Sequence, residues 1–449
     1  MKHLGLILVS LLMWTVVWAA DELPRRAWLG AGFQPLPDSV RAQMPDSAGA
    51  RVMFLAEHGP AQAAGIQMGD ILLSLDGQPI RTGAQVLSLV KDKYHSGEII
   101  KAELQRNGER LTKSVTLAEA PREHSPDFDV LYGTFTMDDA LRRTIITRPH
   151  RAGKLPTVIM CGGLGCYSLD NPTGMLDAYV EVLYALTRAG FATVRIEKTG
   201  MGDSQGKPCA DQDFDYEVQG LVAGIQSLAN YSFIDTSKLI LYGHSMGGFT
   251  APCVAQVIPV KGIVAQSTSA IGWFEYMMTN QRRQLVLEGI SYDSIEVAQA
   301  LAEKAFHQLY VEQRSLDDIV KEHPEYADYL AAPANYTFMQ DLGQLNIAEK
   351  WKHVEANVLF IYGSSDFVTA RDEHLYGVNL VNSYHPGHAQ YAEIDDMDHY
   401  FLRVPDQQAS FNNLAAGMPI KELNRDVIRV IVNWCKDVAG MNAGHGVER

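Results

Sequence analysis

The sequence is short of basic residues and has no basic run, collagen-like period or heptad array. Lysine and arginine number 38 against 53 aspartates and glutamates, which gives a formal net charge of −15. Such a charge argues against nucleic acid or an anionic membrane surface as the main partner. The hydrophobic fraction of 47% is ordinary for a globular protein, and 449 residues are enough for two or three domains.

Cysteine is also scarce, and its pattern excludes the familiar zinc sites. The five cysteines form no C-x-x-C pair, and no His-rich ligand pattern accompanies them. The sequence therefore predicts no metal site. The odd count leaves at least one thiol unpaired or paired between chains. These residues are Cys161, Cys166, Cys209, Cys253 and Cys435.

Long hydrophobic runs are missing beyond the first twenty positions, which read MKHLGLILVSLLMWTVVWAA. Lys2 supplies a positive start, an apolar core follows, and Ala19 and Ala20 are small residues suited to cleavage. This pattern is typical of a secretory signal peptide over residues 1–20. We expect an exported protein, periplasmic or secreted, with no membrane span after cleavage. An uncleaved anchor is the alternative, because the apolar run is near the lower length limit for spanning.

Residues 26–119 alternate apolar runs with turn signals, which predicts a small β-rich domain with one or two helices. ARVMFLA reads as a strand, and IIKAELQRNGERLTKSVTL reads as a hairpin that turns at Asn107-Gly108. GAQVLSLVKDKY has the apolar spacing of a helix.

This stretch resembles a PDZ domain of the type found in bacterial periplasmic serine proteases. The resemblance lies in GPAQAAGIQMGDILLSLDGQPI and in GERLTKSVTL. It implies that a loop near the start of the domain holds the C-terminal carboxylate of a peptide through backbone N–H groups, and that the peptide adds a strand to the sheet edge. The alternative is that the module only packs on its neighbour. The matching loop is WLGAGF, so the expected peptide-binding residues are Trp28, Leu29, Gly30 and Ala31.

After a linker rich in proline and charge, at residues 120–129, strands alternate with helices over residues 130–443. PTVIMCGG, FATVRIE, KLILYG, VKGIVAQST, NVLFIYG and AQYAEID read as strands, and amphipathic helices lie between them. This alternation predicts a mostly parallel sheet covered by helices on both faces.

Two serines in this region lie in the pattern G-x-S-x-G, which holds a nucleophilic serine on a sharp strand-to-helix turn. Ser245, in LYGHSMGGF, directly follows an apolar strand and precedes an apolar helix. Ser204, in GMGDSQGKP, has neither neighbour and reads as part of a loop. We therefore expect Ser245 to be the nucleophile.

A serine hydroxyl is a weak nucleophile, so it needs a base and a group that orients the base. His399 follows the strand in YAEIDDMDHYF, and Asp366 follows the strand in LFIYGSSDFVT. Catalytic groups of α/β sheets gather at the carboxyl edge of the strands, which favours both residues. Asp398 is the rival acid, but adjacent side chains usually diverge.

The tetrahedral intermediate also needs two backbone donors for its oxyanion. The N–H of Met246, the residue after the nucleophile, is the first candidate. The loop CGGLGC after the first of these strands supplies the second, with Leu164 preferred and Gly163 next.

Residues 130–440 resemble an α/β-hydrolase of the esterase and serine-aminopeptidase-like group. The resemblance lies in CGGLGC, GHSMGG, YGSSD and DMDHYF, although the histidine that many esterases carry before the oxyanion glycine is absent. RIEKTGMGDSQG is similar to a structural loop of that superfamily, which would make Ser204 part of a loop that lines the site. The expected fold class is an α/β-hydrolase fold preceded by a small β-rich PDZ-like domain.

More than eighty residues of helical character interrupt the strands, which predicts a helical cap at about 270–350. Four apolar residues at its start are candidates for lining the acyl or side-chain pocket, although cap core is the simpler interpretation of each. Arg282 and Arg283 are candidates for binding a substrate carboxylate, with solvated surface the preferred interpretation. The apolar four are Trp273, Phe274, Tyr276 and Met277.

Cys166 and Cys209 both fall on loops at the expected catalytic edge, so we hypothesise a disulfide that braces the site. Cys253, on the helix after the elbow, reads as a buried small hydrophobe.

The leading functional prediction is an exported serine hydrolase that cleaves carboxylic esters through an acyl-enzyme and needs no cofactor. One alternative is an aminopeptidase-like serine peptidase that uses the PDZ-like domain to recruit peptide ends. Another is a non-catalytic peptide-binding protein, against which the Ser–Asp–His set argues.

Overall fold

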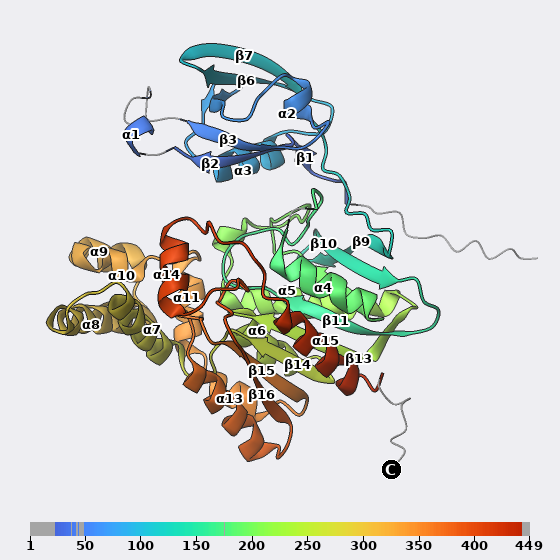
Figure 1. Cartoon of the computed structure of the whole chain (residues 1–449), viewed down its shortest axis with the longest axis vertical. Helices are drawn as coiled ribbons and strands as arrows, with labels where there is room; N and C mark the ends of the chain where they lie inside the picture. The colour runs from blue at the N-terminus through green and yellow to red at the C-terminus, as the bar shows by residue number, and fades with distance from the viewer. Residues whose placement is uncertain (1–22, 37, 42–43, 45–48, 175, 442–449) are drawn as a thin grey trace, which may run out of the picture.

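The structure of the protein is a computed structural model that describes residues 23–36, 38–41, 44, 49–174 and 176–441. The predicted signal peptide, residues 1–20, lies outside these described residues. Two main sheets are present, a small one formed by the first part of the chain and a large one formed by the rest (Figure 1). Within the described ranges, no helix has the length and apolar character needed to cross a bilayer.

The small sheet has six strands in the order β2-β3-β4-β6-β7, with β5 paired to β4. As the sequence predicted, β6 and β7 form a hairpin that turns at Asn107 and Gly108, both with positive φ. The strands are β2 (Ala31–Pro35), β3 (Ala50–Leu55), β4 (Ile71–Leu75), β5 (Gln78–Pro79), β6 (Ile99–Arg106) and β7 (Glu109–Thr116). The helices are α1 (Asp38–Arg41), α2 (Pro60–Ala63) and α3 (Gly83–Lys93).

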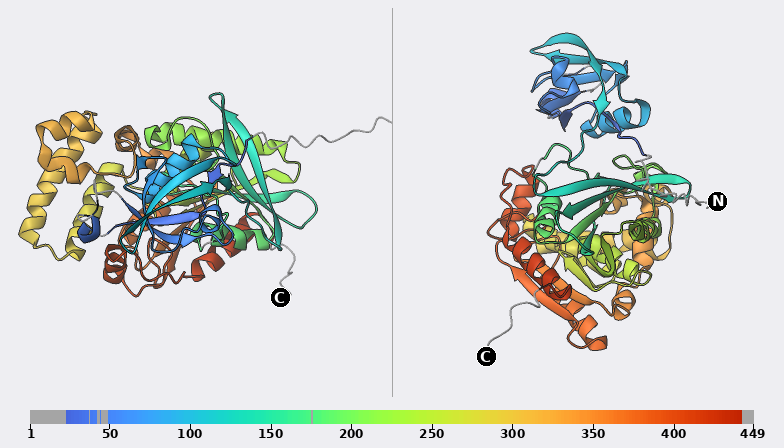
Figure 2. Two further views of the ribbon diagram at one scale, coloured as in Figure 1. Left: turned by 90° about the horizontal axis from the view of Figure 1, so that it is seen from above. Right: turned by 90° about the vertical axis from the view of Figure 1, so that its right-hand side faces the viewer.

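The small module is attached to the rest of the chain by two segments that run side by side (Figure 2). Strand β1 (Ala27–Trp28) enters the module, and the antiparallel strand β8 (Ala118–Glu119) leaves it. Just before β1, the buried guanidinium of Arg25 contacts the carboxylates of Asp170 and Asp203. A network of buried charged side chains therefore holds the start of the small module to the rest of the chain.

The large sheet has eight strands in the order β16-β15-β14-β13-β11-β12-β10-β9. All neighbours from β12 to β16 are parallel, as predicted. Strand β11 is buried along its whole length, which explains its continuous apolar run. The parallel strands are β11 (Leu155–Cys161), β12 (Ala192–Ile196), β13 (Ile234–His244), β14 (Gly262–Gln266), β15 (Asn357–Gly363) and β16 (Ala389–Ile394).

Two antiparallel strands, β9 (Phe128–Met137) and β10 (Ala140–Pro149), complete this sheet and were not expected from the sequence. The expected linker at 120–129 therefore overlaps the start of β9. Glu123 of this segment is also buried, and its carboxylate pairs with the guanidinium of Arg195 at 2.7 Å. Proline and charge indicated a linker, but the charge of Glu123 belongs to a buried ion pair.

Helices cover both faces of the large sheet (Figure 1). Side chains of α4 and α15 pack in one hydrophobic cluster, and those of α5, α6 and α13 pack in another. Asp177 and Asp213 cap the N-termini of α4 and α5 by accepting backbone N–H bonds. These helices are α4 (Ala178–Arg188), α5 (Phe214–Ser227), α6 (Gly247–Ala255), α13 (Arg371–Tyr384) and α15 (Asp426–Val438).

The cap expected at about 270–350 corresponds to a group of helices between β14 and β15. Its larger helices are α7 (Trp273–Leu287), α8 (Tyr292–Phe306), α9 (Leu316–Glu322), α10 (Ala327–Leu330), α11 (Tyr336–Gln344) and α12 (Ile347–Lys352). A further helix, α14 (Gln407–Ala415), contacts α7 from the other end of the chain.

Candidate active site

Ser245 occupies a sharp turn between β13, which ends at His244, and α6, which begins at Gly247. Its φ is +54°, in the left-handed region that non-glycine residues rarely adopt. The backbone holds this strained conformation by a bond from Ser245 N–H to the Gln266 carbonyl at 3.0 Å. The turn matches the strand–turn–helix context of a nucleophile elbow.

The glycines around Ser245 are required by close backbone contacts. A Cβ on Gly243 would overlap the carbonyl oxygen of Gly247, and a Cβ on Gly247 would overlap the carbonyl oxygen of Cys161. The sequence pattern is therefore a packing requirement of the elbow.

The structure brings the three predicted residues of the catalytic set together at the carboxyl edge of the sheet. His399 Nε2 lies 3.1 Å from Ser245 Oγ, and His399 Nδ1 lies 3.0 Å from Asp366 Oδ2. Asp366 follows β15 and His399 follows β16, so residues separated by 154 positions meet through the strand order. A proton taken from the hydroxyl would pass to an imidazole that a carboxylate already orients.

Asp366 is fully buried and is held as a carboxylate. Burial by itself raises its pKa, but the charge and hydrogen bond of His399, with bonds from Thr369, outweigh burial and hold the pKa well below its usual range. Its Oδ1 accepts the N–H groups of Val368 at 2.8 Å and Thr369 at 2.9 Å. The acid therefore has a fixed orientation and remains charged.

The rival acid, Asp398, faces a different set of partners. Its Oδ1 accepts the N–H groups of Tyr400 and Leu402, and its Oδ2 accepts the hydroxyl of Ser410 at 3.0 Å. Asp398 thus shapes the loop that carries His399 and does not contact the imidazole.

His244, the residue before Ser245 in the G-x-S-x-G pattern, contacts the loop that carries His399. Its Nδ1 accepts the Tyr179 hydroxyl at 2.7 Å, which leaves Nε2 to donate to the His399 carbonyl at 3.0 Å. Burial lowers the pKa of His244 to about 3, so the ring stays neutral. No sequence pattern linked these rings, because the contact depends on how two loops pack.

The expected oxyanion donors lie beside the nucleophile. Leu164 and Met246 line the same pocket as Ser245, and a Cβ on Gly163 would lie 3.7 Å from the Ser245 Cβ. In the described part of the chain, neither the Met246 N–H nor the Leu164 N–H has a hydrogen-bond partner. Two backbone donors are therefore available on the pocket side of the elbow.

The pocket at Ser245 has a volume of about 300 Å³, and residues of the cap form part of its lining. Of the four apolar cap candidates, Trp273, Tyr276 and Met277 line it. Phe274 does not, since its ring packs within the cap against Phe306 and Tyr310.

The two arginine candidates have different positions. Arg282 is exposed, as the preferred interpretation had it. Arg283 is instead tied to the protein: its guanidinium donates to the carbonyls of Phe367 and Val368 at 3.0 Å and pairs with Glu373 at 3.5 Å. Arg283 therefore holds the loop after Asp366, and among the described residues it is not one that lines the Ser245 pocket.

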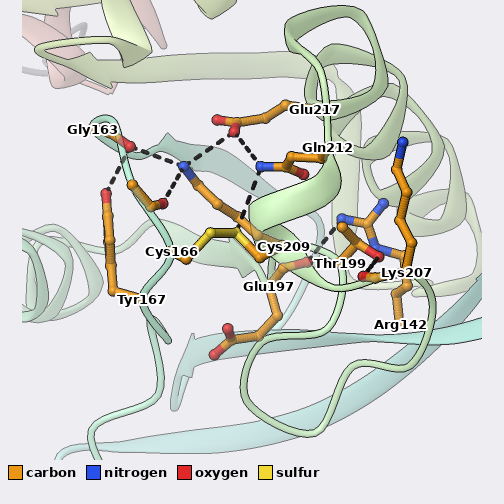
Figure 3. Close-up of a disulfide and its surroundings, with 12 residues drawn as sticks. Arg142, Gly163, Cys166, Tyr167, Glu197, Thr199, Lys207, Cys209, Gln212 and Glu217 are labelled. Atoms are coloured by element: carbon orange, nitrogen blue, oxygen red, sulfur yellow. Dashed lines mark hydrogen bonds and ion pairs between the residues drawn. A yellow bond between two sulfur atoms is a disulfide. The ribbon is translucent and has the colours of Figure 1, made fainter. Parts of the chain in front are cut away.

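Cys166 and Cys209 form a disulfide with an S–S distance of 2.06 Å (Figure 3). The other three cysteines are free and buried. The second G-x-S-x-G serine, Ser204, is buried, and its hydroxyl accepts the N–H of Arg143 at 3.0 Å. Its loop lines a cavity next to the small module and not the Ser245 pocket, so the expectation that it lines the site was wrong.

The predicted peptide-binding residues, Trp28, Leu29, Gly30 and Ala31, line that second cavity, which measures about 1160 Å³. Side chains of α3 form part of the same wall, and the opposite wall belongs to the hydrolase portion, including both cysteines of the disulfide. The loop that would hold the end of a peptide thus faces the other domain.

The fold, the nucleophile elbow and the hydrogen-bonded side chains of Ser245, His399 and Asp366 together define a serine hydrolase. It has the α/β-hydrolase fold and an N-terminal PDZ domain. The family model for serine aminopeptidase, S33, matches residues 173–406, more than half of the chain, and a PDZ-domain model matches residues 27–117. The chain belongs to the serine aminopeptidase S33 family.

Individual relatives match the two parts separately. A probable periplasmic serine endoprotease DegP-like of Pseudomonas putida is 38% identical over 118 residues, covering 25% of this chain and 23% of that protein. The chain thus spans about a quarter of the length of that relative. Esterase EstD of Thermotoga maritima is 22% identical over 290 residues, covering 64% of each chain. The solved structure of Est1E from Butyrivibrio proteoclasticus with ferulic acid bound has a TM-score of 0.43 and 13% identity, and covers 70% of this chain and 100% of that chain.

Proposed function

We propose that the protein hydrolyses carboxylic esters through an acyl-enzyme on Ser245. The observation that carries the proposal is the chain of hydrogen bonds from Ser245 through His399 to Asp366. The serine end of this chain lines a pocket next to the cap. Ser245 Oγ attacks the carbonyl carbon, and His399 takes its proton and returns it to the leaving alcohol. Water, activated by the same imidazole, then releases the acid.

The N–H groups of Met246 and Leu164 would hold the oxyanion during both steps. Met246 follows the nucleophile directly, and Leu164 lies on the adjoining loop, so both residues lie beside Ser245 in the same pocket. Asp366 keeps the tautomer of His399 that presents Nε2 to the serine as an acceptor.

The lining of the pocket favours a neutral acyl group over a charged peptide end. Its described lining residues include Phe249, Trp273, Tyr276 and Met277, and none of them has a charged side chain. An aminopeptidase needs an acidic group to hold the substrate's ammonium, because an unpaired charge is costly to bury. This pocket therefore supports an ester with an apolar or aromatic acyl group.

The experiment compares a panel of p-nitrophenyl esters with aminoacyl p-nitroanilides, together with labelling by a fluorophosphonate probe. We expect ester hydrolysis and labelling in the wild type and loss of both in Ser245→Ala. Ser204→Ala is the matched control, since it removes the serine of the other G-x-S-x-G motif. Hydrolysis that survives Ser245→Ala would refute the mechanism, and preferred cleavage of the anilides would favour a peptidase.

A peptidase that recruits peptide ends is the second candidate, and a specific observation supports it. The loop of Trp28 to Ala31 and the exposed Leu87 of α3 line the cavity that faces the hydrolase domain. Titration of the full chain with C-terminal peptides, and with the same peptides amidated, tests it. Binding lost on amidation and in Leu87→Glu supports recruitment, whereas an absence of binding leaves the module a packing role. Peptide binding without probe labelling would instead favour a non-catalytic binding protein.

Export to an oxidising compartment is part of the proposal. The disulfide between Cys166 and Cys209 supports it, because such bonds persist outside the reducing cytoplasm. The apolar start of the sequence supports cleavage near Ala20. Cell fractionation with N-terminal sequencing of the mature protein tests this, and an uncleaved cytoplasmic protein would contradict it.

A further inference from the structure

A buried lysine lies behind the oxyanion loop and has no part in the mechanism described so far. Lys198 follows β12, and its exposed fraction is 7%. Its Nζ donates to the carbonyl oxygens of Gly163 at 2.9 Å and Gly165 at 3.0 Å, and lies 3.1 Å from Glu217 Oε2. An ammonium has three N–H donors, so these three acceptors satisfy it completely.

The carbonyl of Gly163 receives a second donor from the other side of the loop. The hydroxyl of Tyr167 donates to this oxygen at 3.1 Å, and both partners are labelled in Figure 3. One carbonyl thus accepts a charged and a neutral donor at once, which uses both of its lone pairs. Gly163 O is therefore held more firmly than an ordinary loop carbonyl.

The same peptide group that contains the Gly163 carbonyl also contains the Leu164 N–H. In a planar trans peptide these two groups point in opposite directions. Fixing the carbonyl toward Lys198 and Tyr167 therefore fixes the N–H away from them, and Leu164 lines the pocket of Ser245. A cation on the carbonyl also polarises the amide, which strengthens its N–H as a donor.

We propose that Lys198, assisted by Tyr167, is a positioning residue that orients and polarises the Leu164 N–H for the oxyanion. This inference rests on the proposed function, because it requires an oxyanion at Ser245. Lys198 is held in turn by Glu217, whose Oε2 also accepts Gln212 Nε2 at 2.8 Å. The disulfide of Cys166 with Cys209 closes the loop on the same side.

The test measures ester hydrolysis by the full chain with Lys198→Met and Tyr167→Phe. We expect Lys198→Met to lower kcat by roughly 10- to 100-fold, less than or comparable to the loss of a direct oxyanion donor. Tyr167→Phe leaves the ammonium in place and should lower kcat by about three- to tenfold. KM should change by less than about twofold in both, since the ground-state ester makes little use of the oxyanion site.

A boronic acid inhibitor separates positioning from general loosening of the loop. It forms a tetrahedral adduct on Ser245 whose oxygen occupies the oxyanion site, so its affinity should fall by about the same factor as kcat. Lys238→Met is the matched control, because Lys238 also donates to a backbone carbonyl, that of Ala439 at 3.1 Å, away from the pocket. We expect kcat and boronate affinity to be unchanged in this control.

Lys198→Met leaves Glu217 as a buried carboxylate without its cation, so the variant could fail to fold. The double variant Lys198→Met with Glu217→Gln removes both charges and should retain the circular dichroism spectrum and the same low kcat. A folded double variant with wild-type kcat and boronate affinity would overturn the inference, as would a rise in KM with no loss of boronate affinity. A wild-type protein that neither hydrolyses esters nor reacts with the fluorophosphonate probe would instead refute the proposed function itself.

Discussion

Asp366 Oδ2 lies 3.0 Å from His399 Nδ1 although the two residues are 33 positions apart, whereas Asp398, the sequence neighbour of His399, contacts Ser410 instead. The two acids are both buried, so burial does not distinguish them. Their hydrogen-bond partners do: one carboxylate orients the imidazole, and the other organises the loop.

Replacing each acid by asparagine should therefore have very different effects. Asp366→Asn removes the acceptor that fixes the imidazole tautomer, and we expect kcat for ester hydrolysis to fall by about 10³- to 10⁴-fold. Asp398→Asn keeps an oxygen for the N–H groups of Tyr400 and Leu402, so kcat should stay within about fivefold. Steady-state kinetics on a p-nitrophenyl ester measures both. The reverse order of the two effects would assign the orienting role to Asp398.

The disulfide should contribute to stability because it closes a long loop. Cys166 and Cys209 are separated by 43 positions, and the loss of such a crosslink costs up to about 4 kcal/mol in the unfolding free energy. We expect Cys166→Ser with Cys209→Ser to lower Tm by several degrees in thermal unfolding. A reductant should lower Tm of the wild type and leave that of the double variant unchanged. A wild-type Tm that does not respond to full reduction would contradict a stabilising role.

Glu197 should make stability depend on pH near neutrality. Burial raises its pKa to about 7 from an ordinary value of 4.5, although the hydrogen bond from Ser168 and the charges of Arg26 and Arg195 oppose this. The folded state then binds a proton more tightly than the unfolded state, so this contribution to stability is greatest at low pH and declines as pH rises from about 4.5 to 7.

Glu197→Gln removes that titration while keeping an oxygen that can accept the N–H groups of Leu169 and Asp170. We expect the variant to gain roughly 1–3 kcal/mol relative to the wild type between pH 5 and pH 8. Urea unfolding at each pH measures the difference. A constant difference across this range would show that Glu197 titrates normally in the folded protein.

Arg25 should anchor the PDZ domain to the hydrolase domain. Its guanidinium contacts Asp170 and Asp203 and also donates to the carbonyls of Ala120 and Pro121, all with little exposure. Arg25→Met leaves buried carboxylates with fewer cations, and we expect a loss of about 3–5 kcal/mol with faster proteolysis near residues 120–127.

Arg188→Met is the comparison for that experiment, because Arg188 pairs with Asp127 in the same region but is about half exposed. An exposed pair of this kind contributes little, so the unfolding free energy should change by less than about 1 kcal/mol. Equal losses in the two variants would indicate that the buried network does not anchor the domain.

Much of the fold could be predicted because its signals are local. The hairpin at Asn107-Gly108 and the elbow at Ser245 follow from residues that tolerate positive φ or close backbone approach. The antiparallel strands β9 and β10 were missed, because proline and charge before them suggested a linker. Glu123 is charged for a different reason, its buried pairing with Arg195, which no local pattern reveals.

The residues of the candidate site were likewise predicted where the signal was local and missed where it was not. Ser245, Asp366 and His399 each follow a strand, so the sequence alone pointed to one edge of the sheet. Phe274 packs in the cap core, which was the simpler interpretation, but helical spacing could not say which residues of that helix face the pocket. His244 and Lys198 were missed because their partners, the carbonyls of His399 and Gly163, are backbone atoms of distant loops.

The sequence by itself determined most of the order of strands and helices, the sharp turn at Ser245 and the two-part organisation, since these depend on backbone preference and apolar periodicity over short stretches. The sequence favoured Asp366 as the acid, but only the tertiary structure decided which partners Asp398 has, which carbonyls surround Lys198 and which wall faces the predicted peptide loop. Those relationships depend on strand order and loop packing. Strand order brings together residues that are far apart in the sequence, and a pattern of residue types along the chain does not give the distances between them in space.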